Sequence, residues 1–411
     1  MSVKKRDRAM QRLVRERQEK TGESYQAAWQ QMAAPVPLEQ PQDAGASSRA
    51  TRLPLPLTSR EKVPPNKPTP IMARPQVDSF WPDRLLVKNA DRWDIRRLSV
   101  GVSKSPWSSL IEDENRHRCA SMFALDTWQP LLQREVPLGE AVSALVTYTG
   151  PHEEGEIFEA VLFGWNEERP APAQISVRGE PDPSERIFER AESKSVHAHE
   201  IAILPITIAS PMLFVDRFTI TDAKDWIVHD IRTHGRSVFV QGGDLPGEMF
   251  TGSASVILKP LVAKDRVEIA ATYIGKSAST SLKVELSGAS KPTDQKRAVS
   301  YFLPMSTDVT IMPTQCTQIM GRPTRDFIPE RLVIADADDW IVNDIRSGIH
   351  RQTAQSGSIP GLAFSVHAVG CNMSLDRISK AEDLVIVTTY SESSKEEGSG
   401  FLCGVQGRLA Q

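Results

Sequence analysis

From residue 76 onward, apolar residues come in short runs rich in Val, Ile, Thr and Phe, separated by Gly, Pro, Asp and Ser about every 8–12 residues. This pattern is typical of strands in a sandwich or barrel, and no long helical period interrupts it. It predicts six strands between residues 212 and 286, at Met212–Thr221, Trp226–Thr233, Ser237–Gln241, Ala254–Leu261, Arg266–Ile274 and Ser281–Leu286. The charged stretch Pro181–Lys194 is interpreted as a short helix or an exposed loop.

An internal repeat organises this region. At an offset of 114 residues, Val215–Phe250 aligns with Pro329–Phe364 without a gap, and 16 of the 36 positions are identical. Both segments contain Asp-Ala, Asp-Trp-Ile-Val and Asp-Ile-Arg in the same order. The identical residues farther along are Gln241, Gly243, Pro246, Gly247 and Phe250, matched by Gln355, Gly357, Pro360, Gly361 and Phe364.

A third, more divergent copy lies upstream. Its Asp-Arg pair, alanine and tryptophan align with those of the second copy at Asp83-Arg84, Ala90 and Trp93. The segment that precedes this copy, Ile71–Pro75, is similar to Ile319–Pro323, which precedes the copy in the third unit. In each copy a tyrosine closes an apolar strand, at Tyr148, Tyr273 and Tyr390. We therefore divide the chain into three units, near residues 68–170, 203–292 and 311–408.

Each unit has about 90–100 residues, enough for a hydrophobic core of its own, so the units are expected to be tandem domains and not solenoid rungs. Six or seven strands in this length indicate a jelly-roll or immunoglobulin-like sandwich. The immunoglobulin cysteine pair is absent from the sequence. The predicted fold is therefore all-β, with three tandem β-sandwich units of jelly-roll-like type.

The N-terminal region differs in composition. Residues 1–32 carry eight Lys and Arg against four Asp and Glu, and their apolar residues recur at helical spacing, which predicts a basic amphipathic helical head. Ten prolines lie between Ala33 and Pro75, among Ser, Thr, Gln and Ala. Because such a segment buries little apolar surface, residues 33–67 are predicted to be a Pro-rich disordered linker.

Composition narrows the class of protein. The chain has 411 residues, of which 40% are hydrophobic and 25% charged, as in globular proteins. Its net charge of −3 indicates no general affinity for nucleic acid or anionic membranes. The longest apolar run, Ile201–Val215, contains two prolines and is shorter than the roughly 18 residues of a membrane helix. With no signal-like apolar segment and four cysteines without a Cys-x-x-Cys pair, we expect a cytoplasmic protein without a membrane partner.

Two acid–base pairs recur in the second and third units. Asp230 and Arg232, like Asp344 and Arg346, are two residues apart, which places both side chains on one face of a strand. They could hold a charged ligand. Since a catalytic site is normally built once and a fold determinant in every copy, we interpret them as structural pairs or as contacts between units.

Three tryptophans, Trp93, Trp226 and Trp340, occupy one position of the repeat. They could stack on sugars at an exposed surface. An indole beside Ile-Val is more often part of a sandwich core, and we interpret all three, with the three closing tyrosines, as core residues of the repeat.

Other candidate chemistry is sparse. His197 and His199, with Glu200 beside them, have a spacing that zinc could use, although nothing nearby completes the ligand set. The glycines near Gly243 resemble a phosphate loop in spacing but lack its lysine, so a turn is predicted. Cys119, Cys316, Cys371 and Cys403 lie at unrelated places in the units, and buried thiols are expected for the last two. No enzyme signature is present, and no catalytic residue, metal or cofactor is predicted.

These features predict a non-enzymatic structural or interaction protein, a component of a coat-like or scaffold-like assembly. The head is expected to recruit a protein partner, or nucleic acid through residues 4–20, using Arg8, Arg12, Arg15, Arg17, Tyr25 and Trp29. Self-association is expected for the β region. The alternative is a carbohydrate- or small-ligand-binding protein that uses the loops at the ends of the sandwiches.

Overall fold

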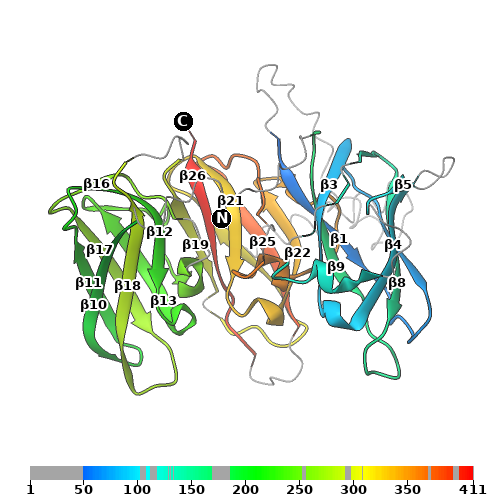
Figure 1. Cartoon of the computed structure of the whole chain (residues 1–411), viewed down its shortest axis with the longest axis horizontal. Coiled ribbons are helices and arrows are strands. Elements are labelled where there is room, and N and C mark those ends of the chain that lie inside the picture. Colours follow the sequence, from blue (N-terminus) through cyan, green and yellow to red (C-terminus); the bar gives the residue numbers. More distant parts are fainter. Residues whose placement is uncertain are drawn as a thin grey trace, which may run out of the picture. The chain divides into compact units, whose positions relative to one another are not determined.

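The structure is a computed structural model of the whole chain (Figure 1). It describes residues 50–101, 108–111, 118–127, 129, 131–132, 134–168, 186–251, 256–291, 298–307, 309–368, 372–391 and 398–410. The predicted head, residues 1–32, lies outside the described residues, as does the linker up to residue 49. Nothing described therefore supports the predicted helices of the head.

The described elements are strands in antiparallel sheets, which confirms the predicted all-β class. The helices among the described residues are 3-10 turns of three or four residues, at Ala90–Arg92 (η1), Ala120–Phe123 (η2), Ala223–Asp225 (η4), Gly247–Phe250 (η5), Ala337–Asp339 (η6) and Gly361–Phe364 (η7). Most turns between strands use Gly or a residue in the left-handed region. Asn89, Asp222 and Asp336, with φ of 51°, 52° and 47°, hold this conformation at the same position of the three units.

The first unit contains two sheets. Their strands pair in the orders β1-β9-β3-β7 and β2-β8-β4-β5, and β6 also pairs with β4. The strands are β1 (Arg52–Thr58), β2 (Thr69–Ala73), β3 (Ser79–Val87), β4 (Trp93–Gly101), β5 (Ser108–Ser109), β6 (Arg118–Cys119), β7 (Val136–Pro137), β8 (Ala141–Tyr148) and β9 (Glu159–Trp165).

The second unit repeats this order. Its sheets are β10-β18-β12-β16 and β11-β17-β13-β14, with β15 also paired to β13. The strands are β10 (Ile187–His197), β11 (Ile201–Thr207), β12 (Met212–Ile220), β13 (Trp226–Thr233), β14 (Arg236–Ser237), β15 (Leu245–Pro246), β16 (Leu261–Val262), β17 (Arg266–Tyr273) and β18 (Ser279–Ala289).

The third unit has the sheets β19-β26-β21 and β20-β25-β22-β23, with β24 paired to β22. The strands are β19 (Tyr301–Ser306), β20 (Cys316–Gly321), β21 (Phe327–Ile334), β22 (Trp340–Ser347), β23 (His350–Arg351), β24 (Ile359–Pro360), β25 (Leu384–Tyr390) and β26 (Leu402–Leu409). In every unit the first strand thus pairs with the last, and the last pairs with the third.

Each pair of sheets shares a hydrophobic core. In the second unit, buried side chains of both sheets belong to one cluster that includes Ile206, Val228, Phe218 and Leu286. Alternate residues of a strand point to opposite faces, and β17 is buried at every second residue accordingly. The six strands predicted between residues 212 and 286 correspond in four cases to β12, β13, β17 and β18.

Two segments differ from the prediction. Residues 52–58 of the predicted linker form β1, which is buried along its length and pairs with β9. β1 is an edge strand of its sheet, so Pro54 and Pro56 can lack an N–H there without breaking an interior ladder. The second difference is β10, which occupies most of the stretch interpreted as a short helix or loop. The predicted unit starts at 68, 203 and 311 therefore each omit the first strand.

Candidate functional site

The repeated tryptophans lie inside the units. Trp93, Trp226 and Trp340 are 1%, 2% and 1% exposed. Each pairs across neighbouring strands with the closing tyrosine of its unit, and the ring centroids of the three pairs are 5.1, 5.3 and 5.0 Å apart. Tyr148 and Tyr273 also accept a backbone N–H from four residues farther along. No face of these indoles is open to a sugar.

In each acid–base pair, the arginine bonds to the aspartate of its own strand. Arg232 Nε donates to Asp230 Oδ2 and Arg346 Nε donates to Asp344 Oδ2, both at 2.6 Å. A register shift just before each aspartate turns the pair outward. The hydrogen bond that Arg232 donates to Asp230 raises the pKa of the Arg232 guanidinium. The pairs tie each strand to the following hairpin, because Ser237 and Arg351 also donate to the aspartates.

A joint connects the second unit to the third, and we call it the 2/3 joint. The N–H of Val240 donates to the carbonyl of Phe302 on β19 (2.8 Å), and Phe302 returns its N–H to Val238 (3.0 Å). Thr324 donates its N–H to the carbonyl of Val240 (2.7 Å). Arg322 donates its N–H to the side chain of Gln241. A loop of the second unit thus extends the outer sheet of the third.

The third unit docks on the first in the same way, at the 3/1 joint. Ala354, which is equivalent to Val240, donates its N–H to the carbonyl of Pro54 on β1 (2.9 Å). Gln76 donates its N–H to Ala354 (2.6 Å), and Arg74 donates its N–H to the side chain of Gln355 (2.8 Å). Each contact has its counterpart at the 2/3 joint.

A glycine allows close approach at both joints. Gly243 has φ of +145° and a Cβ built on it would lie 3.2 Å from Cβ of Pro304. Gly357 has φ of +157° and its Cβ would lie 2.8 Å from Cγ of Pro56. Only glycine combines this backbone with the absence of a side chain. Gly243, one of the glycines that resemble a phosphate loop in spacing, is therefore a joint residue, and so is its equivalent Gly357.

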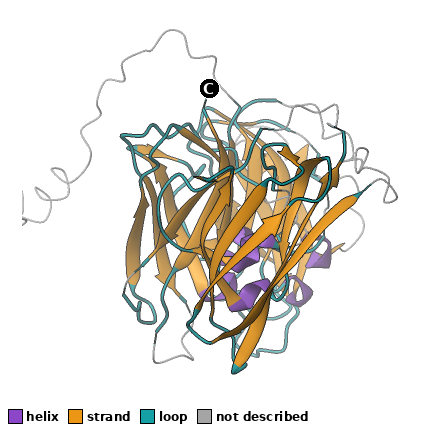
Figure 2. Ribbon diagram, turned by 90° about the vertical axis from the view of Figure 1, so that its left-hand side faces the viewer, coloured by secondary structure: helices purple, strands orange, loops and turns teal. Residues whose placement is uncertain are grey.

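The third unit consequently contacts both other units. Its cluster of buried side chains includes Val240 from the second unit and Val161 and Phe163 from the first. Figure 1 shows β19, β21 and β26 facing the second unit, with β22 and β25 nearer the first. In Figure 2, which faces the second unit, the 3-10 turns of the units gather toward one end of the sheets.

None of the described segments covers the sheet of the second unit that corresponds to these docked sheets, and we call it the uncovered sheet. Its outward residues include Phe188 (47% exposed) and Arg190, which stacks on Phe188 and pairs with Glu285. Lys283 is also outward and pairs with Glu192. The equivalent outward positions are Pro56 and Val161 in the first unit and Pro304 and Gly404 in the third, whereas this face has ion pairs.

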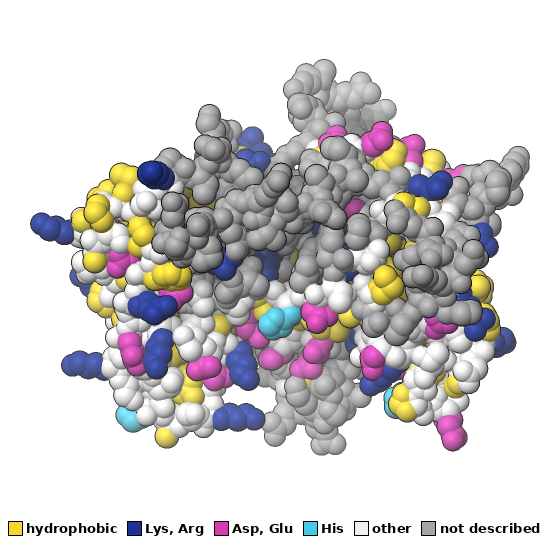
Figure 3. All heavy atoms as spheres, in the orientation of Figure 1, with side chains coloured by type: hydrophobic (Ala, Val, Ile, Leu, Met, Phe, Trp, Pro, Cys, Tyr) yellow, Lys and Arg dark blue, Asp and Glu magenta, His cyan; other side chains and the backbone are white. Residues whose placement is uncertain are grey.

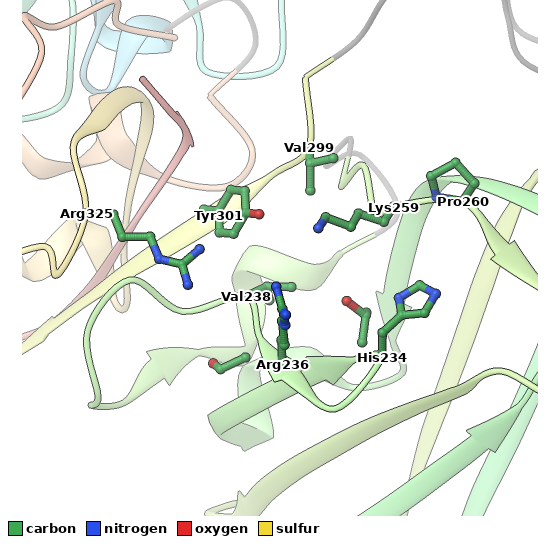
Figure 4. Close-up of a pocket in the computed structure, with 10 residues that line it drawn as sticks. His234, Arg236, Val238, Lys259, Pro260, Val299, Tyr301 and Arg325 are labelled. Carbon is green, nitrogen blue, oxygen red and sulfur yellow. The ribbon is translucent and has the colours of Figure 1, made fainter. Parts of the chain in front are cut away.

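A pocket opens beside the 2/3 joint (Figure 4). Its volume is about 490 Å³, and its lining residues are Thr233, His234, Arg236, Ser237, Val238, Lys259, Pro260, Val299, Tyr301 and Arg325. Four of the ten side chains are basic and none is acidic. On the face drawn in Figure 3, by contrast, Lys and Arg are interspersed with Asp and Glu. Sequence reasoning did not single out these residues, because they come from segments far apart and lie outside the repeat signature.

The other candidates make no site. His197 ends β10 and His199 lies in the following turn with φ of 65°, so the two rings do not share a strand face. No group of three or more His, Cys, Asp or Glu among the described residues is placed to hold a metal. Cys403 is buried, which raises the pKa of its thiol, whereas Cys316 is exposed. Cys371 and the six head residues lie outside the described part of the chain.

No protein-family model matches this chain, and no curated protein sequence matches it. Within the described residues, no helix is both long enough and apolar enough to cross a membrane.

Proposed function

We propose that the chain is a non-enzymatic structural protein, built from three jelly-roll-like sandwiches and used in a coat-like or scaffold-like assembly. The sandwich type is supported by the pairing of first, last and third strands in one sheet of every unit. Two interlocked Greek keys give a double sheet of this kind.

The observation that carries the proposal is the repeated joint. Two backbone hydrogen bonds, a glutamine contact, a glycine and a proline recur at the 2/3 and the 3/1 joints. Such head-to-tail contacts use two different surfaces of a unit and are the kind that builds extended structures. Three units held in this way would form a fixed scaffold, with the N-terminal segment left to recruit a partner.

Self-association would use a different surface, because the uncovered sheet of the second unit is charged. The best candidate is the edge strand β11, where Ile201 and Ile203 are 64% and 67% exposed. An apolar edge strand presents unpaired backbone groups and invites pairing with another chain. We infer that a second copy of the chain covers β11.

Size-exclusion chromatography with light scattering on the full chain tests this proposal. A defined oligomer of the 45.5 kDa chain is expected, and Ile201→Lys with Ile203→Lys should reduce it to the monomer. Ile349→Lys is the control, because Ile349 is 78% exposed in a hairpin away from β11. A monomeric wild-type protein at micromolar concentration would contradict the assembly. An oligomer that survives the β11 double change would contradict the surface.

A further inference from the structure

The pocket beside the 2/3 joint gathers positive charge that the described protein does not neutralise. Arg236 lies on β14, Lys259 precedes β16, and Arg325 precedes β21. Figure 4 shows both guanidinium groups and the ammonium group directed toward the same space. All three side chains are exposed, and no ion pair joins any of them to a described carboxylate. A ligand would therefore meet three available cations.

Two acidic residues, Asp265 and Asp230, bond to the lining residues His234 and Ser237. Asp265 accepts from His234 Nε2 (3.1 Å) and from the N–H of Val262 (2.8 Å). Asp230 accepts from Arg232 and from Ser237. These carboxylates are therefore bonded to His234, Arg232 and Ser237, and no ion pair with a described carboxylate compensates the three cations of the pocket.

One wall of the pocket is apolar. Val238 is 4% exposed at its base, and Pro260 and Val299 line the side. The ring of Tyr301 lies between Arg325 and Lys259 in Figure 4, with its hydroxyl directed toward the side of Lys259. A ligand that fits this pocket would combine an anionic group with a planar or apolar body.

The pocket is not an unavoidable result of docking, because the equivalent place at the 3/1 joint is filled. Val238 and Gln352 are equivalent, since their N–H groups donate to Ile231 and Ile345 of matching strands. Gln352 is fully buried and exchanges two hydrogen bonds of 2.9 Å with Asp376, which stands where the second unit has Lys259. The 3/1 joint therefore fills this space with an amide and a carboxylate, whereas the 2/3 joint leaves the space open and lined by cations.

We propose that this pocket binds a small phosphate ester with an aromatic or apolar body, a role that goes beyond the proposed scaffold function. Arginine forks match the oxygen geometry of a phosphate, and Lys259 adds a point charge from another side. A phosphate monoester has three terminal oxygens, one for each of three cations from three segments, whereas a carboxylate has two and carries less charge. The body of the ester packs on Tyr301 and Val238.

Isothermal titration of the full chain with phenyl phosphate tests the site, in low-salt buffer because exposed charges are screened by salt. The test variant carries Arg236→Gln, Lys259→Gln and Arg325→Gln. Its matched control carries Arg60→Gln, Lys67→Gln and Lys276→Gln, which remove the same charge from exposed residues elsewhere. We expect the test variant to bind at least about tenfold more weakly and the control to bind like the wild type. Equal binding by all three proteins, or equal weakening in both variants, overturns the site.

The apolar wall is tested separately with Tyr301→Leu, since leucine occupies the equivalent position, Leu53, in the first unit. This change should weaken phenyl phosphate at least about threefold and leave inorganic phosphate unchanged. Equal affinity of the wild type for both probes overturns the assignment of an apolar body. Circular dichroism melting of each variant establishes that a loss of binding is not a loss of fold.

Discussion

The first strands of the first and second units, β1 and β10, occupy the same place in the fold but have opposite surroundings. The outward residues of β1, Pro54 and Pro56, are buried against the third unit. The outward residues of β10 include Phe188 and Arg190, which are exposed. Inward residues of both strands face their own cores. The joint, and not the strand itself, therefore determines the chemistry of the outer face.

The neighbouring strands follow the same rule. Val161 of β9 is fully buried in a cluster with the third unit, and Gly404 of β26 gives room for Met249 of the second. The equivalent residue of β18 is Glu285, which pairs with Arg190. Charge at these positions marks the uncovered end of the row of units, much as polar caps end a stack of repeats.

The largest effect is expected from removing β1. Deleting residues 1–67 should lower the free energy of unfolding of the first unit by more than about 5 kcal/mol, because Leu53, Leu55 and Leu57 are buried and each is worth about 2–5 kcal/mol. Deleting residues 1–49 keeps β1 and should leave the main melting transition in place. Scanning calorimetry compares the two truncations. Identical melting curves for both would mean that β1 contributes nothing to the fold.

The next effect comes from exchanging the equivalent residues of the covered and uncovered sheets. Val161→Glu places a charge in the 3/1 joint and should cost about 3 kcal/mol or more, since a buried carboxylate finds no partner there. Glu285→Val at the uncovered face should change stability by no more than about 0.5 kcal/mol. Urea unfolding measures both. Similar costs for the two variants would show that the two faces do not differ as described.

A smaller effect is expected from pH at the 2/3 joint. Burial raises the pKa of Glu248, and the nearby Asp336 raises it further, while Lys224 opposes them. A carboxyl whose folded-state pKa is raised favours folding below its unfolded pKa of about 4.5, and this contribution is lost as pH rises through the folded-state pKa. Glu248→Gln should therefore stabilise the protein at pH 7 relative to the wild type and lose that advantage toward pH 4.

Melting temperatures measured from pH 4 to pH 8 check this expectation. The exposed Glu153→Gln serves as the control and should not reproduce the pH-dependent difference. A Glu248→Gln variant that is less stable than the wild type at pH 7 would mean that the carboxylate is held by a favourable contact.

The smallest effect concerns the ion pair of the uncovered face. Arg190→Gln and Glu285→Gln, alone and together, should each change the free energy of unfolding by at most about 0.5 kcal/mol, because exposed pairs gain little in water. A double-mutant cycle at low and high salt measures the coupling. A coupling above about 1 kcal/mol would place this pair in a drier environment than an open face.

Much of the fold could be predicted from the sequence, because the repeat and the alternation of apolar residues in β12, β13, β17 and β18 are local signals. β1 was missed because its prolines look like a linker, and only pairing with β9 makes them acceptable. β10 was missed because charges occupy its outward positions. Composition alone does not distinguish an exposed strand face from a loop.

Some residues of the joints could be found in the sequence repeat, whereas the pocket could not. Gln241, Gln355 and the two glycines belong to the repeat signature, and so do the segments around Arg74 and Arg322. Both segments of the joint recur from unit to unit. Their recurrence does not show that they contact each other, because the two segments of one joint lie in different units. The pocket residues recur in no unit, and only the fold brings Arg236 and Arg325 together.

The position of the third unit has a consequence for synthesis of the chain. A ribosome releases the first unit first, yet among the described residues its outer face, with Phe163 and Val161, packs against residues made more than 190 positions later, such as Ile359. The nascent first unit must therefore keep an apolar sheet exposed while the second unit, whose outer sheet is charged, is synthesised. During that interval, chains on neighbouring ribosomes could dock a third unit of one onto a first unit of another, so the length of the wait sets the risk of exchange between chains.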